Sequence, residues 1–126
     1  SSEPVGHMYP GKGTTYPENI YKFIKLFPDN TIILAHWGGG LLFYELMKEV
    51  KEISKNVYYD TAASSFLYNP KIFELAIEIV GSEKIIFGSD FPILSPKRIL
   101  NEMKNLKEQD LMNITEKNIK NILNLN

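Results

Sequence analysis

Two apolar runs that each end in a polar, glycine-containing segment constrain the fold of this chain more than any other feature. Residues 31–40 read TIILAHWGGG, and residues 84–92 read KIIFGSDFP. Both runs have the short, β-branched character of buried strands, and they deliver His36 and Asp90 just beyond their ends. Because functional groups in α/β proteins gather at the carboxyl ends of parallel strands, we expect both side chains on one rim of the sheet.

The remaining segments predict helices between these strands and one more strand. A third strand is expected at 57–62, followed by a polar loop at 63–69. The expected order is loop–helix–strand–helix–strand–helix–strand–helix–helix, with no internal repeat beyond this alternation. Such an order predicts an α/β fold with a parallel sheet covered by helices.

Five helices are expected from apolar residues at helical spacing. The last is predicted to be capped by Thr115, with Ile119, Ile122 and Leu123 facing inward, and Gly81 is expected to cap the third. The other predicted apolar faces are Ile20, Phe23, Ile24 and Phe27; Phe43, Leu46, Met47, Val50 and Ile53; Ile72, Leu75, Ala76 and Ile79; and Ile99, Met103 and Leu106.

The bulk composition excludes several classes of function. The 126 residues suit one globular domain, with 44% apolar and 23% charged residues. A net charge of -1 without a basic cluster gives no indication of binding to nucleic acid or to an anionic membrane surface. The sequence shows no apolar run of membrane-spanning length and no leader, so the expected location is cytoplasmic. Because the chain has no cysteine, a metal would have to be held by His, Asp or Glu.

His36 and Asp90 are the candidate metal ligands and catalytic residues. A single histidine at a strand end is commonly structural, and a single aspartate in a turn commonly caps that turn. Together, at matched strand ends, an imidazole and a carboxylate form a partial ligand set for Zn²⁺ or a similar divalent ion. Such an ion would lower the pKa of bound water towards about 7, and the carboxylate would be placed to take the proton.

Other residues near the strand ends leave two interpretations open. His7 lies in a proline- and glycine-rich loop and is a candidate for contacting substrate, although exposed histidines are common there. Trp37 could line a substrate pocket or belong to the core, and Asp60 could serve catalysis or packing. The three glycines at 38–40 could let a phosphate approach a helix, but neither phosphate-loop fingerprint is present, so a tight turn with positive φ is favoured.

The order and spacing of four motifs resemble the amidohydrolase-related family. These motifs are SEPVGHMYPGKG, AHWGGG, VYYDTAAS and IIFGSDFP, and the resemblance extends over essentially the whole chain. The family (amidohydrolase 2) belongs to the metal-dependent TIM-barrel hydrolases and also contains aminocarboxymuconate-semialdehyde decarboxylase. The resemblance implies that residues 1–126 form a single partial (β/α)8 barrel, comprising strands six to eight, their flanking helices and the loop after strand five.

The resemblance also implies roles for the two candidate residues. His36 would end strand six and either ligate a second metal or orient the metal-bound water. Asp90 would end strand eight as a metal ligand and proton acceptor. The family's histidine ligand on strand five would precede Ser1, and the HxH pair of strand one has no counterpart here.

The implied activity is that of a metal-dependent hydrolase, with metal-activated water attacking a C–N or ester bond of a small molecule, or a related decarboxylation. A complete barrel needs about 250 residues, so we expect this chain alone to be inactive or weakly active. A partial barrel has open sheet edges and an uncovered apolar face, which predicts a homo-oligomer or pairing with a chain that carries the N-terminal half-barrel. The alternatives are a non-catalytic interaction module that completes a barrel, and a phosphate-binding domain.

Overall fold

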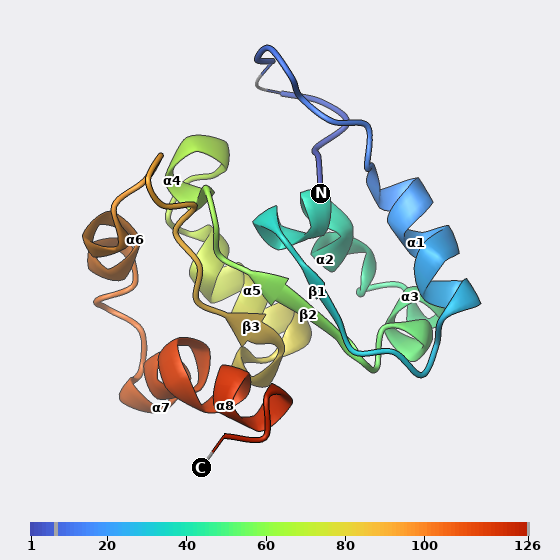
Figure 1. Ribbon diagram of the computed structural model, residues 1–126. Coiled ribbons are helices and arrows are strands. Elements are labelled where there is room, and N and C mark those ends of the chain that lie inside the picture. The colour runs from blue at the N-terminus through green and yellow to red at the C-terminus, as the bar shows by residue number, and fades with distance from the viewer. Residues whose placement is uncertain (7, 126) are drawn as a thin grey trace.

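A three-stranded parallel sheet forms the centre of the computed structural model, which describes residues 1–6 and 8–125 (Figure 1). The strands are β1 (Ile32–Leu34), β2 (Val57–Asp60) and β3 (Ile85–Ile86), in the spatial order β1-β2-β3. Leu34 lies opposite Tyr59, which in turn lies opposite Ile85. Since parallel neighbours need crossover connections, helical segments join each strand to the next. The predicted α/β class is therefore confirmed.

Helical segments surround the sheet on its outer side. In Figure 1, α1, α2 and α3 lie on the β1 side, α5 lies behind the sheet, and α7 and α8 lie beyond β3. The helices are α1 (Pro17–Leu26), α2 (Leu41–Tyr44), α3 (Lys48–Ile53), α4 (Ser64–Leu67), α5 (Ile72–Val80), α6 (Pro96–Glu102), α7 (Glu108–Met112) and α8 (Asn118–Ile122). Three tighter or wider helical segments are η1 (His36–Gly40), η2 (Ser82–Lys84) and the π-helical η3 (Asn113–Lys117).

The hydrophobic core lies between this helical layer and one face of the sheet. Leu34, Val57, Tyr59 and Ile85 contribute from the strands, and alternation along each strand places them on the same face. Several residues predicted on the apolar helix faces are buried: Ile20 and Ile24 of α1, Ile72 and Ala76 of α5, and Ile99 of α6. Phe73 of α5 is also buried, although it was not predicted on that face.

The opposite face of the sheet is more exposed. Ile33 lies between two residues of β1 that are better covered, and 45% of its surface is accessible. Its register partner Tyr58 is half-buried. An apolar side chain on a sheet face would normally be covered by another layer, so this face has the character of a packing surface.

The prediction of one continuous helix over 43–53 is wrong, because the helix is interrupted between α2 and α3. Glu45 turns inward and is buried, where its carboxylate accepts a hydrogen bond of 2.6 Å from the Tyr59 hydroxyl. Leu46 and Met47 were expected on the inner face, but they are 74% and 52% exposed. The bond between Glu45 and the central strand competes with continuation of the helix, which explains the break.

Several other expectations also need correction. Phe23 and Phe27 are exposed and pack against each other with ring centroids 4.8 Å apart. Thr115 lies inside η3 and donates to the Leu111 carbonyl, so it caps no helix. Leu123 is exposed. The loop expected at 63–69 contains α4, and α7 was not predicted.

Candidate metal centre

The structure brings His36 and Asp90 together at the carboxyl ends of β1 and β3. Their closest atoms, His36 Nε2 and Asp90 Oδ2, are 3.9 Å apart, and the side chains are 23% and 37% exposed. Two ligands of one ion at bond lengths of about 2.1 Å lie between about 3 and about 4.2 Å apart, for right-angled and opposed positions. The observed separation is within this range, so both atoms could contact one ion from this rim.

A left-handed residue follows each of the three strands. His36 has a φ of 55°, Ala63 of 57° and Asp90 of 70°. This conformation costs a residue with a side chain about 1–2 kcal/mol, and such strain is typical of functional sites. The conformation turns the chain sharply at each strand end, which leaves His36 and Asp90 at the rim formed by the carboxyl ends of the strands.

The glycines at 38–40 continue the left-handed turn that begins at His36. Gly38, Gly39 and Gly40 have φ values of 65°, 62° and 93°, so the interpretation of this run as a turn with positive φ is confirmed. There is also no room for a side chain at Gly39, because a Cβ at this position would lie 2.4 Å from the carbonyl oxygen of Ser2. The N-terminal segment therefore packs directly on the turn that carries His36.

Asp60, whose role the sequence left open, positions the backbone of this rim. Its Oδ1 accepts hydrogen bonds of 2.9 Å from the backbone N–H groups of both His36 and Ala62. One carboxylate oxygen thus ties the end of β1 to the chain beyond β2. The signal in the sequence was its place in the strand expected at 57–62, but nothing there distinguished a backbone acceptor from a catalytic acid.

Trp37 lies in the core behind His36. The indole N–H donates a 2.8 Å hydrogen bond to Ser64 Oγ, and its ring meets Phe73 edge-on with centroids 5.7 Å apart. The residue has no exposed surface in this chain. A contact between Trp37 and substrate stays a prediction, as does that of His7, which lies outside the described residues.

Thr61 joins the loops that follow β2 and β3. Its hydroxyl donates a 2.7 Å hydrogen bond to the Gly88 carbonyl and accepts one of 2.9 Å from the Gly88 N–H. Asp90 comes two residues later on the same loop. Together with the bonds of Asp60, these contacts fix the loops that bear both candidate ligands relative to one another.

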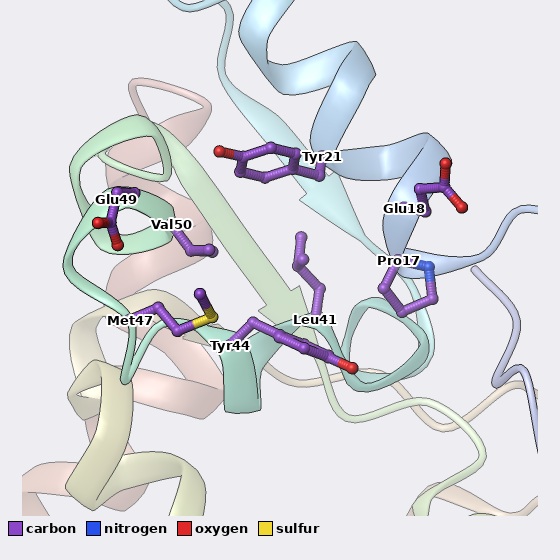
Figure 2. A pocket seen from close by; sticks show the side chains of 8 residues that line it. All are labelled: Pro17, Glu18, Tyr21, Leu41, Tyr44, Met47, Glu49 and Val50. Atoms are coloured by element: carbon purple, nitrogen blue, oxygen red, sulfur yellow. The ribbon is translucent and has the colours of Figure 1, made fainter.

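An apolar groove of about 450 Å³ lies away from this rim, between α1, α2 and α3 (Figure 2). Tyr21, Leu41 and Met47 line it, and the carboxylates of Glu18 and Glu49 stand at its margins. Glu18 forms an ion pair of 2.6 Å with Lys22. The groove contains neither candidate ligand, so the chemistry of the rim does not extend into it.

The donor set at the rim fits a divalent metal only in part. Among residues 1–6 and 8–125, no group of three or more His, Asp or Glu side chains is placed to hold an ion. His36 and Asp90 supply one nitrogen and one oxygen donor, whereas zinc sites have three or four protein ligands. These two residues would therefore form one part of a site that other ligands complete.

The comparison with protein families gives a match over nearly the whole sequence. The family model for amidohydrolases covers residues 7–126. This chain belongs to the amidohydrolase family. The family assigned by resemblance from the sequence motifs is thereby confirmed. A search of the curated proteins gives no match.

Several solved structures that share this fold are decarboxylases. The chain aligns with 5-carboxyvanillate decarboxylase from Sphingomonas paucimobilis at 16% identity and a TM-score of 0.69, covering 84% of this chain and 37% of that one. The alignment with 2,6-dihydroxybenzoate decarboxylase from Rhizobium has 18% identity and a TM-score of 0.65, and it covers 80% of this chain and 36% of that one. A third structure is dihydroxybenzoic acid decarboxylase from Polaromonas sp. JS666 with bound manganese and the inhibitor 2-nitroresorcinol. This alignment has 19% identity and a TM-score of 0.67, and it covers 82% of this chain and 36% of that one.

These alignments show that the fold is part of a TIM barrel. The amidohydrolase-family chain described here spans about 37% of the length of the solved structures that it matches. Its parallel strands and covering helices correspond to that share of the barrel. Within the part of the chain that the structure describes, no helix is long and apolar enough to cross a membrane.

Proposed function

We propose that this chain supplies the His36 and Asp90 part of a divalent-metal site in an enzyme of the amidohydrolase family. The observation that carries the proposal is the 3.9 Å separation of His36 Nε2 and Asp90 Oδ2 at the ends of two parallel strands. One solved structure with this fold was determined with bound manganese, which supports a divalent metal in the proposed site. Zinc and manganese both accept nitrogen and oxygen donors, so either ion suits this pair.

Each residue has a distinct role in this proposal. A bound divalent ion would supply Lewis acidity that stabilises negative charge on the substrate. Asp90 contributes a negative charge and can accept a proton at its carboxylate. His36 provides a nitrogen donor whose direction is set by the left-handed turn and by the Asp60 bond to its backbone.

The reaction that we favour is the decarboxylation of a small hydroxylated aromatic acid. The named solved relatives act on carboxyvanillate or dihydroxybenzoate, and one was determined with 2,6-dihydroxybenzoate bound. Hydrolysis of a C–N or ester bond, expected from the sequence resemblance, is the alternative reaction on the same residues. Both reactions build up negative charge beside the rim, which a divalent cation would stabilise.

Manganese binding tests the proposal directly. Titration of Mn²⁺ monitored by electron paramagnetic resonance should show one saturable site per chain, weakened at least tenfold by His36→Ala and by Asp90→Ala. Because this chain offers two ligands, the affinity should be low, and turnover of 2,6-dihydroxybenzoate should be absent or barely measurable.

Asp29→Asn is the matched control, because Asp29 is an exposed carboxylate in the turn before β1. It should leave Mn²⁺ binding unchanged. Equal Mn²⁺ affinity in wild type, His36→Ala and Asp90→Ala would exclude the rim site.

A second candidate function is that of a half-barrel subunit that completes a barrel with another chain. The exposed face of the sheet favours it, since Ile33 is apolar and accessible and lies beside Tyr58. β1 and β3 are also the edge strands of the described sheet, and each could pair with a further strand. A homo-oligomer is the alternative assembly on the same surface.

A further inference from the structure

A separate pocket lies between the N-terminal segment, α2 and α4. Its volume is about 430 Å³, and its lining includes Glu3, Phe43, Tyr44 and Tyr68, together with Gly39 and Gly40. Tyr44 and Pro17 line both this pocket and the groove of Figure 2, so the two cavities share a wall. The proposed metal ligands do not line this pocket.

The pocket is shaped by the packing of the N-terminal segment on the glycine turn. Ser2 is buried, and its backbone N–H donates a 3.0 Å hydrogen bond to the Thr15 carbonyl. The lack of a side chain at Gly39 allows the Ser2 backbone to approach the turn. The next residue, Glu3, is thereby held beside Tyr68.

The Glu3 carboxylate has an oxygen without a hydrogen-bond donor. Its Oε1 is buried, and it has no hydrogen-bond partner among the residues that the structure describes. The described residues that line the pocket include no lysine or arginine. A carboxylate that lacks donors costs free energy, and Glu3 is only half-buried, so its carboxylate favours a ligand that brings a positively charged donor.

Aromatic rings form the other walls of the pocket. Phe43 and Tyr68 pack edge to face with centroids 6.2 Å apart, and Tyr44 lies one residue beyond Phe43. Burial, together with the charge of Glu3, raises the pKa of Tyr68 to about 12, so its ring stays neutral at physiological pH. Aromatic faces attract organic cations, and a carboxylate beside them adds a hydrogen-bond acceptor.

We propose that this pocket binds an organic ammonium cation with an apolar body, its N–H groups donating to the Glu3 carboxylate and its body lying against Phe43, Tyr44 and Tyr68. The site requires no metal and is distinct from the rim pair, so it goes beyond the proposed function. A primary amine in its protonated form meets both needs, because it carries charge and N–H donors.

The test is a titration with 2-phenylethylamine at pH 7, where the amine is protonated, monitored by ¹H–¹⁵N NMR with EDTA present throughout. Wild type should show saturable shifts for residues around Glu3, Gly40 and Tyr68. Glu3→Gln, which keeps the shape of the side chain, should weaken binding about tenfold or more. Phe43→Leu, which removes an aromatic face, should weaken it about fivefold.

Two comparisons separate charge recognition from simple apolar filling of the pocket. 2-Phenylethanol, the neutral analogue, should bind at least tenfold more weakly than the amine. Glu49→Gln, which neutralises an exposed carboxylate on α3, should bind the amine like wild type. The absence of saturable binding, equal affinity for the alcohol, or equal affinity in folded Glu3→Gln would each overturn the proposal.

Discussion

Asp60 organises the rim although it is neither of the proposed metal ligands. Its Oδ1 accepts from two backbone N–H groups, one of which belongs to His36. His36 itself is held in a left-handed conformation that costs free energy. The conformation of the candidate ligand therefore depends on a carboxylate from the neighbouring strand.

Replacing Asp60 with alanine should affect both stability and metal binding. Two backbone N–H groups would lose their acceptor, which should lower the free energy of unfolding by about 2–3 kcal/mol. Mn²⁺ affinity should also fall, because His36 would lose its support. Urea denaturation and Mn²⁺ titration measure these effects. Asp60→Asn retains one side-chain oxygen acceptor and should recover part of the stability and part of the Mn²⁺ affinity. An Asp60→Ala variant as stable as wild type would contradict this role.

Glu45 should give the stability of the chain a distinct pH dependence. Burial raises the pKa of this carboxyl above its usual 4.5, although the Tyr59 hydrogen bond acts in the opposite direction. The folded state therefore holds the proton more tightly than the unfolded chain does. As pH rises from about 4.5 through the folded-state pKa, unfolding releases a proton and stability falls.

The Glu45→Gln variant removes this titration and keeps an oxygen that can accept from Tyr59. Urea denaturation across this pH range should show the wild type losing stability relative to Glu45→Gln as pH rises. Glu49→Gln, on an exposed carboxylate, should follow the wild type. A constant difference between wild type and Glu45→Gln at every pH would show that Glu45 does not titrate in this way.

At the level of elements, Lys84 connects the start of β3 to the segment that leads into β2. Its ammonium donates to the carbonyls of Ser54 at 2.7 Å and Val57 at 3.0 Å, and also to that of Lys55. These carbonyls lie where α3 has ended and β2 begins, beyond the regular hydrogen bonds of the helix, and the Ser54 carbonyl also accepts from the Val57 N–H at 3.1 Å. Burial lowers the pKa of Lys84, and the charge of Glu45 opposes that shift.

Lys84→Met should therefore destabilise the chain by about 2–4 kcal/mol, because it removes a charged donor from several carbonyls and keeps the apolar stem. Urea denaturation at neutral pH measures the loss. The exposed neighbour Lys55 offers the control, since Lys55→Met should change stability by less than about 0.5 kcal/mol. Similar losses in both variants would argue against a bridging role for Lys84.

The elements that could be predicted from the sequence are those whose signals are local. The strands around Leu34 and Ile85 were evident from short β-branched runs, and the positive φ of residues 38–40 from three adjacent glycines. The break after Tyr44 was not evident, because it depends on a bond between Glu45 and Tyr59, 14 residues further along the chain. The rim positions of His36 and Asp90 followed from their strands, whereas the Glu3 pocket depends on tertiary packing against Gly39.

At the scale of the whole molecule, the exposed sheet face should promote association. Ile33→Asp places a charge on that face, opposite the helices that form the core. Sedimentation velocity should show wild type associating with itself or with a chain that carries the N-terminal half-barrel, and Ile33→Asp shifted to the monomer. Leu46→Asp, at an exposed apolar position outside the sheet, is the control and should associate like wild type. A monomeric wild type that also fails to bind the N-terminal half would contradict this role.

The left-handed residues at the three strand ends are evenly spaced along the chain. His36, Ala63 and Asp90 follow one another at intervals of 27 residues, from 36 to 63 and from 63 to 90. The side chains at these positions share no chemistry, and the intervening helices differ in number and length. The chain therefore contains a repeat that a comparison of side chains would not detect, since what recurs every 27 residues is a backbone conformation.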